Sequence, residues 1–163
     1  MSLQLSSFPA LPARQSEAPL SQQGQDLHRS LVKLSRRAQQ VFLLSRLDNL
    51  PYATIASVLG IEVEVVEQAM VRVLQHCRRQ EAGSLSVEES INEQASRWYV
   101  HLQSPHATAS QRIEFRHWLD AEPEHLAAFE ATERLWRRLQ APAMVLGANG
   151  WHRRKRRVYI LWC

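Results

Sequence analysis

The sequence has few of the residues and motifs that enzymes, metal sites and disulfide frameworks require. Only two of its 163 residues are cysteines, Cys77 and Cys163, and they lie far apart, which indicates a reducing compartment rather than a disulfide framework. It contains no Gly-rich phosphate loop, no His-Glu-x-x-His, no Cys-x-x-Cys and no nucleophile elbow. His76 and Cys77 are adjacent and would point about 100° apart on a helix, a poor arrangement for a metal ion. We therefore expect no catalytic residues, no metal site and no cofactor.

Glycine is also scarce, and no stretch alternates between apolar and polar residues as a strand does. Five glycines, together with many Leu, Ala, Arg, Gln and Glu, predict an all-α fold of one domain or two small ones. Residues 1–25 differ from the rest because Pro9, Pro12 and Pro19 break stretches dominated by Ser and Gln. They lack an amphipathic period and the pattern of a signal peptide, so we expect them to be disordered.

The net charge of +4 is distributed unevenly along the chain. Residues 26–80 carry 8 basic and 5 acidic side chains, whereas residues 81–141 carry 6 basic and 10 acidic ones. Residues 142–163 add five basic side chains and no acidic one. A basic region beside an acidic one indicates either two partners or a contact between the two regions themselves.

The stretch 52–74 is the most regular part of the sequence. Its apolar residues recur three and four positions apart in two blocks, and Gly60 stands between the blocks, where a helix needs a left-handed residue to end. A short helix, a tight Gly turn and a longer helix form the helix-turn-helix pattern, although an ordinary helical hairpin has the same spacing. Before it, Asp26 and Ser35 are expected to cap two further helices, and Pro51 is expected to be the first residue of the third.

Several short runs within residues 26–80 point to a known family. The runs are Leu34–Leu44, Leu50–Tyr52, Ile55–Ala56, Leu59–Ile61 and Leu74–Arg78. They resemble region 4 of bacterial extracytoplasmic-function sigma factors, and the His-Cys pair in the last run is similar to that of the iron-siderophore branch. The resemblance implies a helix-turn-helix that binds promoter DNA. A complete factor also needs a region 2 to hold polymerase and open DNA, and because residues 1–25 are too few for it, we expect that this chain alone does not direct transcription.

The second helix of a helix-turn-helix places its early exposed residues in the major groove. The residues expected to face DNA are Glu64, Val65, Glu67, Gln68 and Arg72. The candidates for phosphate contacts are Arg36 and Arg37, with Arg46, Arg78 and Arg79, unless these arginines form only a solvated face. Three carboxylates, those of Glu62, Glu64 and Glu67, oppose the approach of a polyanion, so we predict weak DNA binding with little sequence preference.

Residues 81–87 contain Gly83 and predict a linker, and residues 88–140 predict a small three-helix bundle. Thr108 forms a capping box with Gln111 at the start of one helix, and a turn at Pro123 begins another. The runs Ala95–Leu102, Phe115–Leu119, Pro123–His125, Ala128–Phe129 and Arg134–Trp136 resemble the cytoplasmic N-terminal domain of FecR-type anti-sigma regulators. The resemblance implies a module that binds a cognate sigma factor, region 4 included. The residues expected to bind the partner are Trp98, Leu102, Trp118, Leu119, Phe129 and Trp136.

The three tryptophans in that set, at positions 98, 118 and 136, are otherwise expected as core residues of the bundle. A bundle so small seldom buries three indoles completely, and we therefore expect at least one of them on the partner surface.

Residues 141–150 are punctuated by Pro and Gly and predict a linker. Trp151 is soon followed by a basic run, and the chain then ends in Val-Tyr-Ile-Leu-Trp-Cys. In the FecR-type family a membrane span begins at this place. We therefore expect residues 151–163 to be a basic tail with the start of such a span, which either contacts the inner face of a membrane or remains a simple basic tail.

The sequence thus predicts a cytoplasmic transcription regulator of the sigma/anti-sigma type, in iron or siderophore signalling by family implication. Its expected partners are promoter DNA, RNA polymerase or a cognate sigma factor, and, within the chain, one module for the other. Two alternatives stay open. The chain is either an interaction-only anti-sigma protein that sequesters an intact sigma factor, or a fusion remnant without function.

Overall fold

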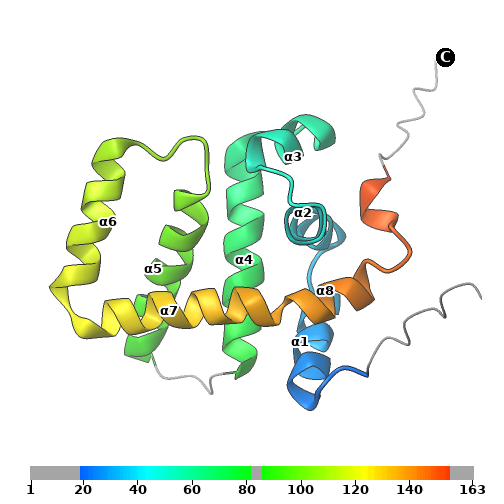
Figure 1. Cartoon of the computed structure of the whole chain (residues 1–163), viewed down its shortest axis with the longest axis horizontal. Coiled ribbons are helices and arrows are strands. Elements are labelled where there is room, and N and C mark those ends of the chain that lie inside the picture. Colours follow the sequence, from blue (N-terminus) through cyan, green and yellow to red (C-terminus); the bar gives the residue numbers. More distant parts are fainter. Residues whose placement is uncertain (1–18, 82–85, 155–163) are drawn as a thin grey trace, which may run out of the picture.

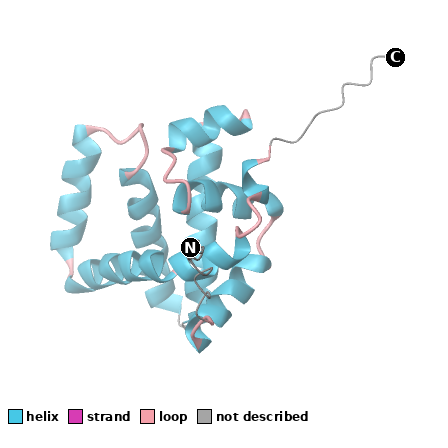
Figure 2. Cartoon of the chain, turned by 45° about the vertical axis from the view of Figure 1, so that its right-hand side comes forward, coloured by secondary structure: helices cyan, strands magenta, loops and turns pink. Residues whose placement is uncertain are grey.

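The computed structural model describes residues 19–81 and 86–154, and these residues are helical with no strand among them (Figures 1 and 2). The predicted all-α class is confirmed. The helices of the first half are α1 (Gln22–Val32), α2 (Arg36–Arg46), α3 (Tyr52–Leu59) and α4 (Val63–Glu81). Those of the second half are α5 (Ser86–Leu102), α6 (Ala109–Ala121), α7 (Pro123–Arg138), α8 (Gln140–Leu146) and the 3-10 turn η1 (Trp151–Arg153).

Helix α1 begins earlier than the sequence predicts. Ser21 is its N-cap, and the Ser21 hydroxyl accepts a hydrogen bond from the backbone N–H of Gly24 at 3.1 Å. Asp26, the predicted cap, lies inside the helix and pairs with Arg29. The predicted disordered segment 1–25 is therefore wrong for its last residues, which form the first turn of α1, while its first eighteen lie outside the described residues.

The helix-turn-helix has the local geometry that the sequence predicts. Ser35 caps α2 by accepting from the N–H of Ala38, and Pro51 is the N-cap of α3, one position before the predicted place. Gly60 ends α3 with φ 65°, a left-handed conformation. Glycine adopts this conformation with the least steric strain because it has no Cβ. Its backbone reverses the chain into α4, the longest helix of the structure's described part.

The second half begins with three helices, as expected. Thr108 accepts from the N–H of Gln111, and the Gln111 side chain accepts from the N–H of Thr108, which completes the predicted capping box of α6. Pro123 occupies the first turn of α7, where its missing N–H leaves no hydrogen bond unmade. In Figure 1, α7 crosses α5 and α4 and continues into α8.

The prediction of a linker over residues 141–150 is wrong, because this stretch contains α8 and leads into η1. Pro142 lies in the first turn of α8, where a proline is tolerated. Helix α8 packs against α1, and η1 packs against α2. Gly147 lets this segment approach closely, since a Cβ there would lie 2.7 Å from a methyl carbon of Leu47. We call residues 139–154 the C-terminal strap.

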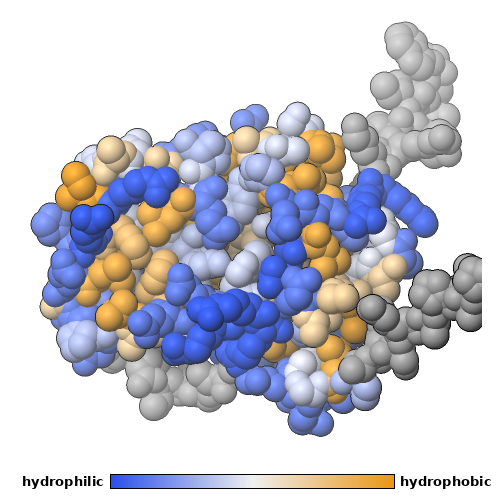
Figure 3. Space-filling view, in the orientation of Figure 1, coloured by the Kyte–Doolittle hydropathy of each residue, from blue (hydrophilic) through white to orange (hydrophobic). Residues whose placement is uncertain are grey.

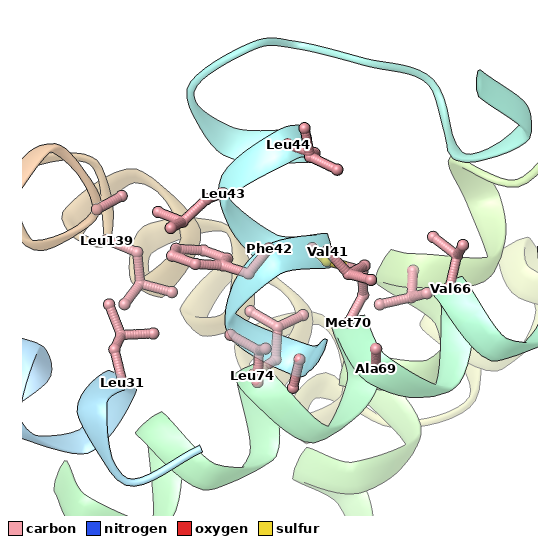
Figure 4. Close-up of a cluster of buried hydrophobic side chains, with 14 of the residues drawn as sticks. Leu31, Val41, Phe42, Leu43, Leu44, Val66, Ala69, Met70, Leu74 and Leu139 are labelled. Atoms are coloured by element: carbon pink, nitrogen blue, oxygen red, sulfur yellow. The ribbon is translucent and has the colours of Figure 1, made fainter. Parts of the chain in front are cut away.

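One apolar core is shared by the two halves of the chain. Helix α4 packs against α1, α2 and α3 and also against α5 and α7. Leu135 and Leu139 of the second half belong to the same buried cluster as Leu31 and Phe42 of the first, and Figure 4 shows Leu139 in that cluster. The buried residues contributed by α4 are Val66, Ala69, Met70, Val73, Leu74 and Cys77. Burial of α4 on two sides fixes which of its residues remain available to a ligand.

Candidate nucleic-acid interface and its cover

The residues predicted to read DNA lie on the first three turns of α4, and they differ in exposure. Glu64, Val65, Gln68 and Arg72 are exposed, with Val65 at 41 % the only large apolar side chain among them. Glu67 is half-buried because it faces α5 instead of solvent. The described residues of this helix face therefore present a mixed surface rather than a basic one.

Two glutamates of this face meet histidines of the second half of the chain. The Nδ1 atom of His106, in the loop between α5 and α6, lies 3.2 Å from a carboxylate oxygen of Glu64. The Nδ1 atom of His101, near the end of α5, lies 4.0 Å from a carboxylate oxygen of Glu67, which is too long for a hydrogen bond. That oxygen and the Nε2 atom of His101 are buried without a hydrogen-bond partner. Two of the three acidic residues expected to repel DNA, Glu64 and Glu67, thus lie against the other module, and Glu62 is exposed.

A groove of about 640 Å³ separates the remaining part of this face from α5 and α6. Gln68 and Arg72 line it on the α4 side. The residues that line it from α5 and α6 include Gln94, Arg97, Trp98, Gln111 and Glu114. While α5 and α6 form the opposite wall of the groove, the helix face that carries Gln68 and Arg72 cannot enter the major groove of a DNA duplex.

Two arginines near the end of α4 also contact the second half. The guanidinium of Arg78 donates to the hydroxyl of Thr132 at 2.7 Å and to the carbonyl of Ala128 at 3.2 Å, both on α7. Thr132 has no exposed surface. Arg79 pairs with Glu89 of α5 at 2.8 Å. The structure therefore uses these predicted phosphate-binding side chains to join the two halves of the chain.

Arg36 and Arg37 lie in the first turn of α2, on the side of the molecule that the strap covers. The guanidinium carbon of Arg36 lies 3.4 Å from the ring centroid of Trp151, a cation–π contact. Arg37 is exposed. The predicted phosphate contacts are thus not gathered into one basic patch around α4.

Trp136 is the aromatic residue that crosses from α7 into the first half. Its ring lies edge-on to Phe42, with centroids 5.8 Å apart, and it also contacts Tyr99 at 6.1 Å. The guanidinium of Arg46 lies 5.1 Å from the same indole. Of the six residues predicted to bind a partner, Trp136 is the one whose ring contacts the core of the helix-turn-helix half.

The other five predicted partner-binding residues lie in or beside a half-buried cluster between α5, α6 and α7. Phe115 joins it at 4.8 Å from Phe129 and 5.5 Å from Trp98. Trp118 stacks on His125 at 4.4 Å, and its indole N–H donates to Gln94. Leu102 and Leu119 are half-buried.

No residue of α6 is buried, and Ile113 on α6 and Leu126 on α7 are 59 % and 47 % exposed. Figure 3 shows apolar side chains at the surface over this end of the molecule.

Asp48 holds the strap through polar contacts that reasoning from the sequence missed. Its carboxylate lies 3.1 Å from Nε2 of His152 and accepts from the guanidinium of Arg153 at 2.6 Å. The Arg153 hydrogen bonds lower the pKa of Asp48. Burial lowers the pKa of His152 below its usual value, against the opposing effect of Asp48. The Gln40 side chain adds hydrogen bonds to the carbonyls of His152 and Arg154 at 3.0 and 3.3 Å.

Some of these missed residues had a signal in the sequence. Leu139, Ala143 and Leu146 recur at four and three positions, the spacing of a helix face, but Pro142 and Gly147 outweighed it. His101 and His106 had none, because nothing local marks a histidine as the neighbour of a distant glutamate.

No described helix combines the length and the apolar character needed to cross a membrane. No three His, Cys, Asp or Glu side chains in the described ranges lie close enough to hold a metal ion. The predicted tail 151–163 falls outside the described residues from position 155 onward.

Comparison with known protein families divides the chain much as its sequence does. Residues 24–77 match the family model described as Sigma-70, region 4, and residues 93–135 match a domain of unknown function, DUF4880. Comparisons with curated proteins and with solved structures gave no match. Region 4 is a regulatory domain that in general binds promoter DNA and RNA polymerase. The chain therefore carries a segment similar to region 4 of sigma-70 factors, next to a second helical domain that packs against it.

Proposed function

We propose that this protein is a transcription regulator of the sigma/anti-sigma type in which residues 88–140 mask the DNA-binding face of residues 26–80. The observation that carries this proposal is the cover over α4. Glu64 and Glu67 meet His106 and His101, and the groove beside Gln68 is walled by α5 and α6. A recognition helix that faces its own chain is not free to enter a major groove.

The masked state is favoured by tethering and by charge. The predicted linker 81–87 is wrong at both ends, because α4 ends at Glu81 and α5 begins at Ser86. Few residues therefore separate the two modules, so the second meets the first at an effective concentration of order mM, and a weak contact persists. Residues 26–80 are net basic and residues 81–141 net acidic, which favours their encounter in a salt-sensitive manner. Apolar contacts such as Trp136 against Phe42 supply the affinity.

The second module is, in this proposal, a FecR-type anti-sigma domain, and the regulated genes are those of iron or siderophore uptake. Support comes from the runs Phe115–Leu119 and Pro123–His125 and from the His76-Cys77 pair, which carry the family resemblance. The protein acts in the cytoplasm, and residues 151–163 contact the inner face of the membrane through their basic run.

A second candidate function is an interaction-only anti-sigma protein that sequesters an intact sigma factor. The histidine contacts favour it, because Glu64 and Glu67, two of the three carboxylates that oppose DNA, lie against the second module. In this version the region 4-like segment serves as a scaffold for α5 to α7, and its own affinity for DNA is negligible.

Negative charges introduced at the cover separate these functions. His101→Glu combined with His106→Glu places like charges against Glu67 and Glu64 and should open the cover. The control is His117→Glu, alone or together with a second exposed substitution that adds one more negative charge. His117 is exposed, so this change alters the net charge without facing α4.

Anisotropy titrations with promoter DNA at low salt are the readout. Masking predicts weak binding by the native chain and the control, and at least about tenfold tighter binding by the opened variant. Equal binding by all three chains would refute masking. The interaction-only function holds under two conditions. The opened variant must stay folded and not bind DNA, and the native chain must bind a sigma factor.

A further inference from the structure

The strap and α2 bring basic side chains together on one side of the molecule. Arg36 and Arg37 lie in the first turn of α2, and Arg154 follows η1, which packs against α2. All three residues are exposed. In the described part of the chain, no carboxylate lies within ion-pair distance of their guanidinium groups. We call these three residues the basic face, and none of them lines the groove beside α4.

Two contacts hold the end of the strap beside the first turns of α2. The Gln40 side chain donates to the backbone carbonyl of Arg154 at 3.3 Å, and Gln40 is one helical turn away from Arg36 and Arg37. The guanidinium carbon of Arg36 lies 3.4 Å from the ring centroid of Trp151. Because Arg154 is held through its backbone, its side chain remains exposed on the same side of α2.

The segments that form this face contain no acidic residue. Residues 27–47 carry five Lys or Arg and no Asp or Glu, and residues 134–163 carry eight and none. The carboxylate of Asp48, the next residue after the first segment, is already held by the strap. Arginines in a first turn oppose the helix dipole, so α2 gains no stability from the charges of Arg36 and Arg37. Positive charge gathered without a counter-charge indicates a polyanionic partner outside the chain.

Apolar neighbours favour a lipid surface over a nucleic acid as this partner. On the strap, Met144 and Val145 are 49 % and 42 % exposed, and Trp151 is half-buried. In the sequence, basic residues 155–157 and then apolar residues 158–162 follow. Basic side chains close to apolar and aromatic ones suit the interface of an anionic bilayer, where the charges meet headgroups and the apolar groups reach the acyl boundary. A phosphodiester backbone would use the basic side chains alone.

We propose that the basic face docks the folded protein on the anionic headgroups of a membrane through Arg36, Arg37 and Arg154. The inference rests on the proposed membrane contact of residues 151–163, and it extends that contact from the tail to a surface of the folded chain. In Figure 1, η1 lies at the opposite end of the molecule from α6. Docking at the basic face therefore leaves the cover of α4 free to open.

The test is a sedimentation assay of the full chain with vesicles of phosphatidylcholine, prepared with and without phosphatidylglycerol. The face variant, Arg37→Gln with Arg154→Gln, removes two charges, and neither side chain makes a hydrogen bond or ion pair among the described residues. One basic residue near an anionic leaflet contributes about a fivefold gain in affinity, so this variant should bind the anionic vesicles at least about tenfold more weakly. The control, Arg112→Gln with Arg116→Gln, changes the net charge equally at exposed positions of α6 and should bind like the native chain. Circular dichroism checks that both variants are folded.

Vesicle binding that requires phosphatidylglycerol, falls with added salt and is weakened by the face variant alone would support the proposal. Equal binding by the native chain and the face variant would overturn it, while the proposed contact of the tail would survive. If the native chain binds neither kind of vesicle, both fail. Masking is tested at His101 and His106, so none of these outcomes decides it.

A titration of the same chains with a short DNA duplex gives the remaining outcome. The proposal predicts that the face variant loses affinity for the anionic vesicles by a larger factor than for the duplex. If the face variant weakens the duplex and leaves vesicle binding unchanged, the basic face takes a nucleic acid and the proposal is wrong.

Discussion

The region 4-like segment is covered on two sides by surfaces that differ in how well their polar groups are satisfied. On the strap side, His152 and Arg153 share Asp48, and the Gln40 side chain bonds two backbone carbonyls. One buried atom on this side, Nδ1 of His152, lacks a partner. On the α5 and α6 side, Nδ1 of His101 lies 4.0 Å from the Glu67 carboxylate, and two buried atoms, one of Glu67 and one of His101, lack partners. A buried polar atom without a partner costs about 1–3 kcal/mol.

This difference indicates which side opens. The strap adds Leu139 and Ala143 to the common core, whereas α5 adds Val100 and α6 buries no residue. A segment with few buried contacts and unsatisfied polar groups separates at a lower free energy than the rest of the protein. We infer that the strap holds the fold together and that α5 and α6 form the reversible cover of α4.

The largest expected effect is on the strap side. Leu139 has no exposed surface, so Leu139→Ala should lower the free energy of unfolding by about 2–5 kcal/mol through the cavity that it leaves. Leu126 on α7 is 47 % exposed, and the matched Leu126→Ala change should cost less than about 0.5 kcal/mol. Urea denaturation measures both. Equal costs would mean that the strap is not part of the core.

A smaller loss is expected at the polar contact of the strap. Asp48→Asn removes the charge that His152 and Arg153 share and should cost about 1–3 kcal/mol. Asp26→Asn is the control, because Asp26 forms an exposed pair with Arg29 that contributes little. If urea midpoints fall equally for the two variants, the Asp48 contacts do not hold the strap.

The contact between α4 and α7 should show a loss of about 1 kcal/mol. Thr132→Val keeps the shape of the buried side chain and removes the oxygen that accepts from Arg78. Thr54→Val, at an exposed position of α3, controls for the altered chemistry. Thermal unfolding compares the two variants. An unchanged midpoint for Thr132→Val would mean that the hydrogen bond from Arg78 does not stabilise the contact between α4 and α7.

The smallest effect is a dependence on pH. Because burial lowers the pKa of His152, its contribution to stability is complete above the usual histidine pKa of about 6.5 and is lost as pH falls through the lowered value. The pKa of Asp48 is also lowered, so its contribution persists over this range. The native chain should lose stability between about pH 7 and pH 5.5. His152→Gln should lose less over the same range, and His117→Gln should follow the native chain. A native profile that stays flat would contradict the burial of a neutral His152.

Local features of this fold were predictable from sequence, and distant contacts were not. Ser35, Gly60 and the Thr108 capping box act on residues three or four positions away, so their roles can be read from neighbours alone. Helix α8 was missed because Pro142 and Gly147 resemble breaks, and only packing against α1 explains why the helix forms.

In the candidate site, too, the local features could be predicted from the sequence and the distant contacts could not. Glu64 and Glu67 were correctly placed at the start of the second helix of the motif, since helical periodicity decides that. That they face His106 and His101 follows from the path of the chain through α5, which residue spacing does not encode.

Hydrogen–deuterium exchange of the unmodified full chain, followed by mass spectrometry, tests the difference between the two sides most directly. If α5 and α6 are the reversible cover, amides of residues 89–121 exchange first, and those of residues 140–146 exchange together with α1 and α2. Promoter DNA should accelerate exchange in the first range and leave the second unchanged. Exchange of residues 140–146 before or together with residues 89–121 would contradict the account.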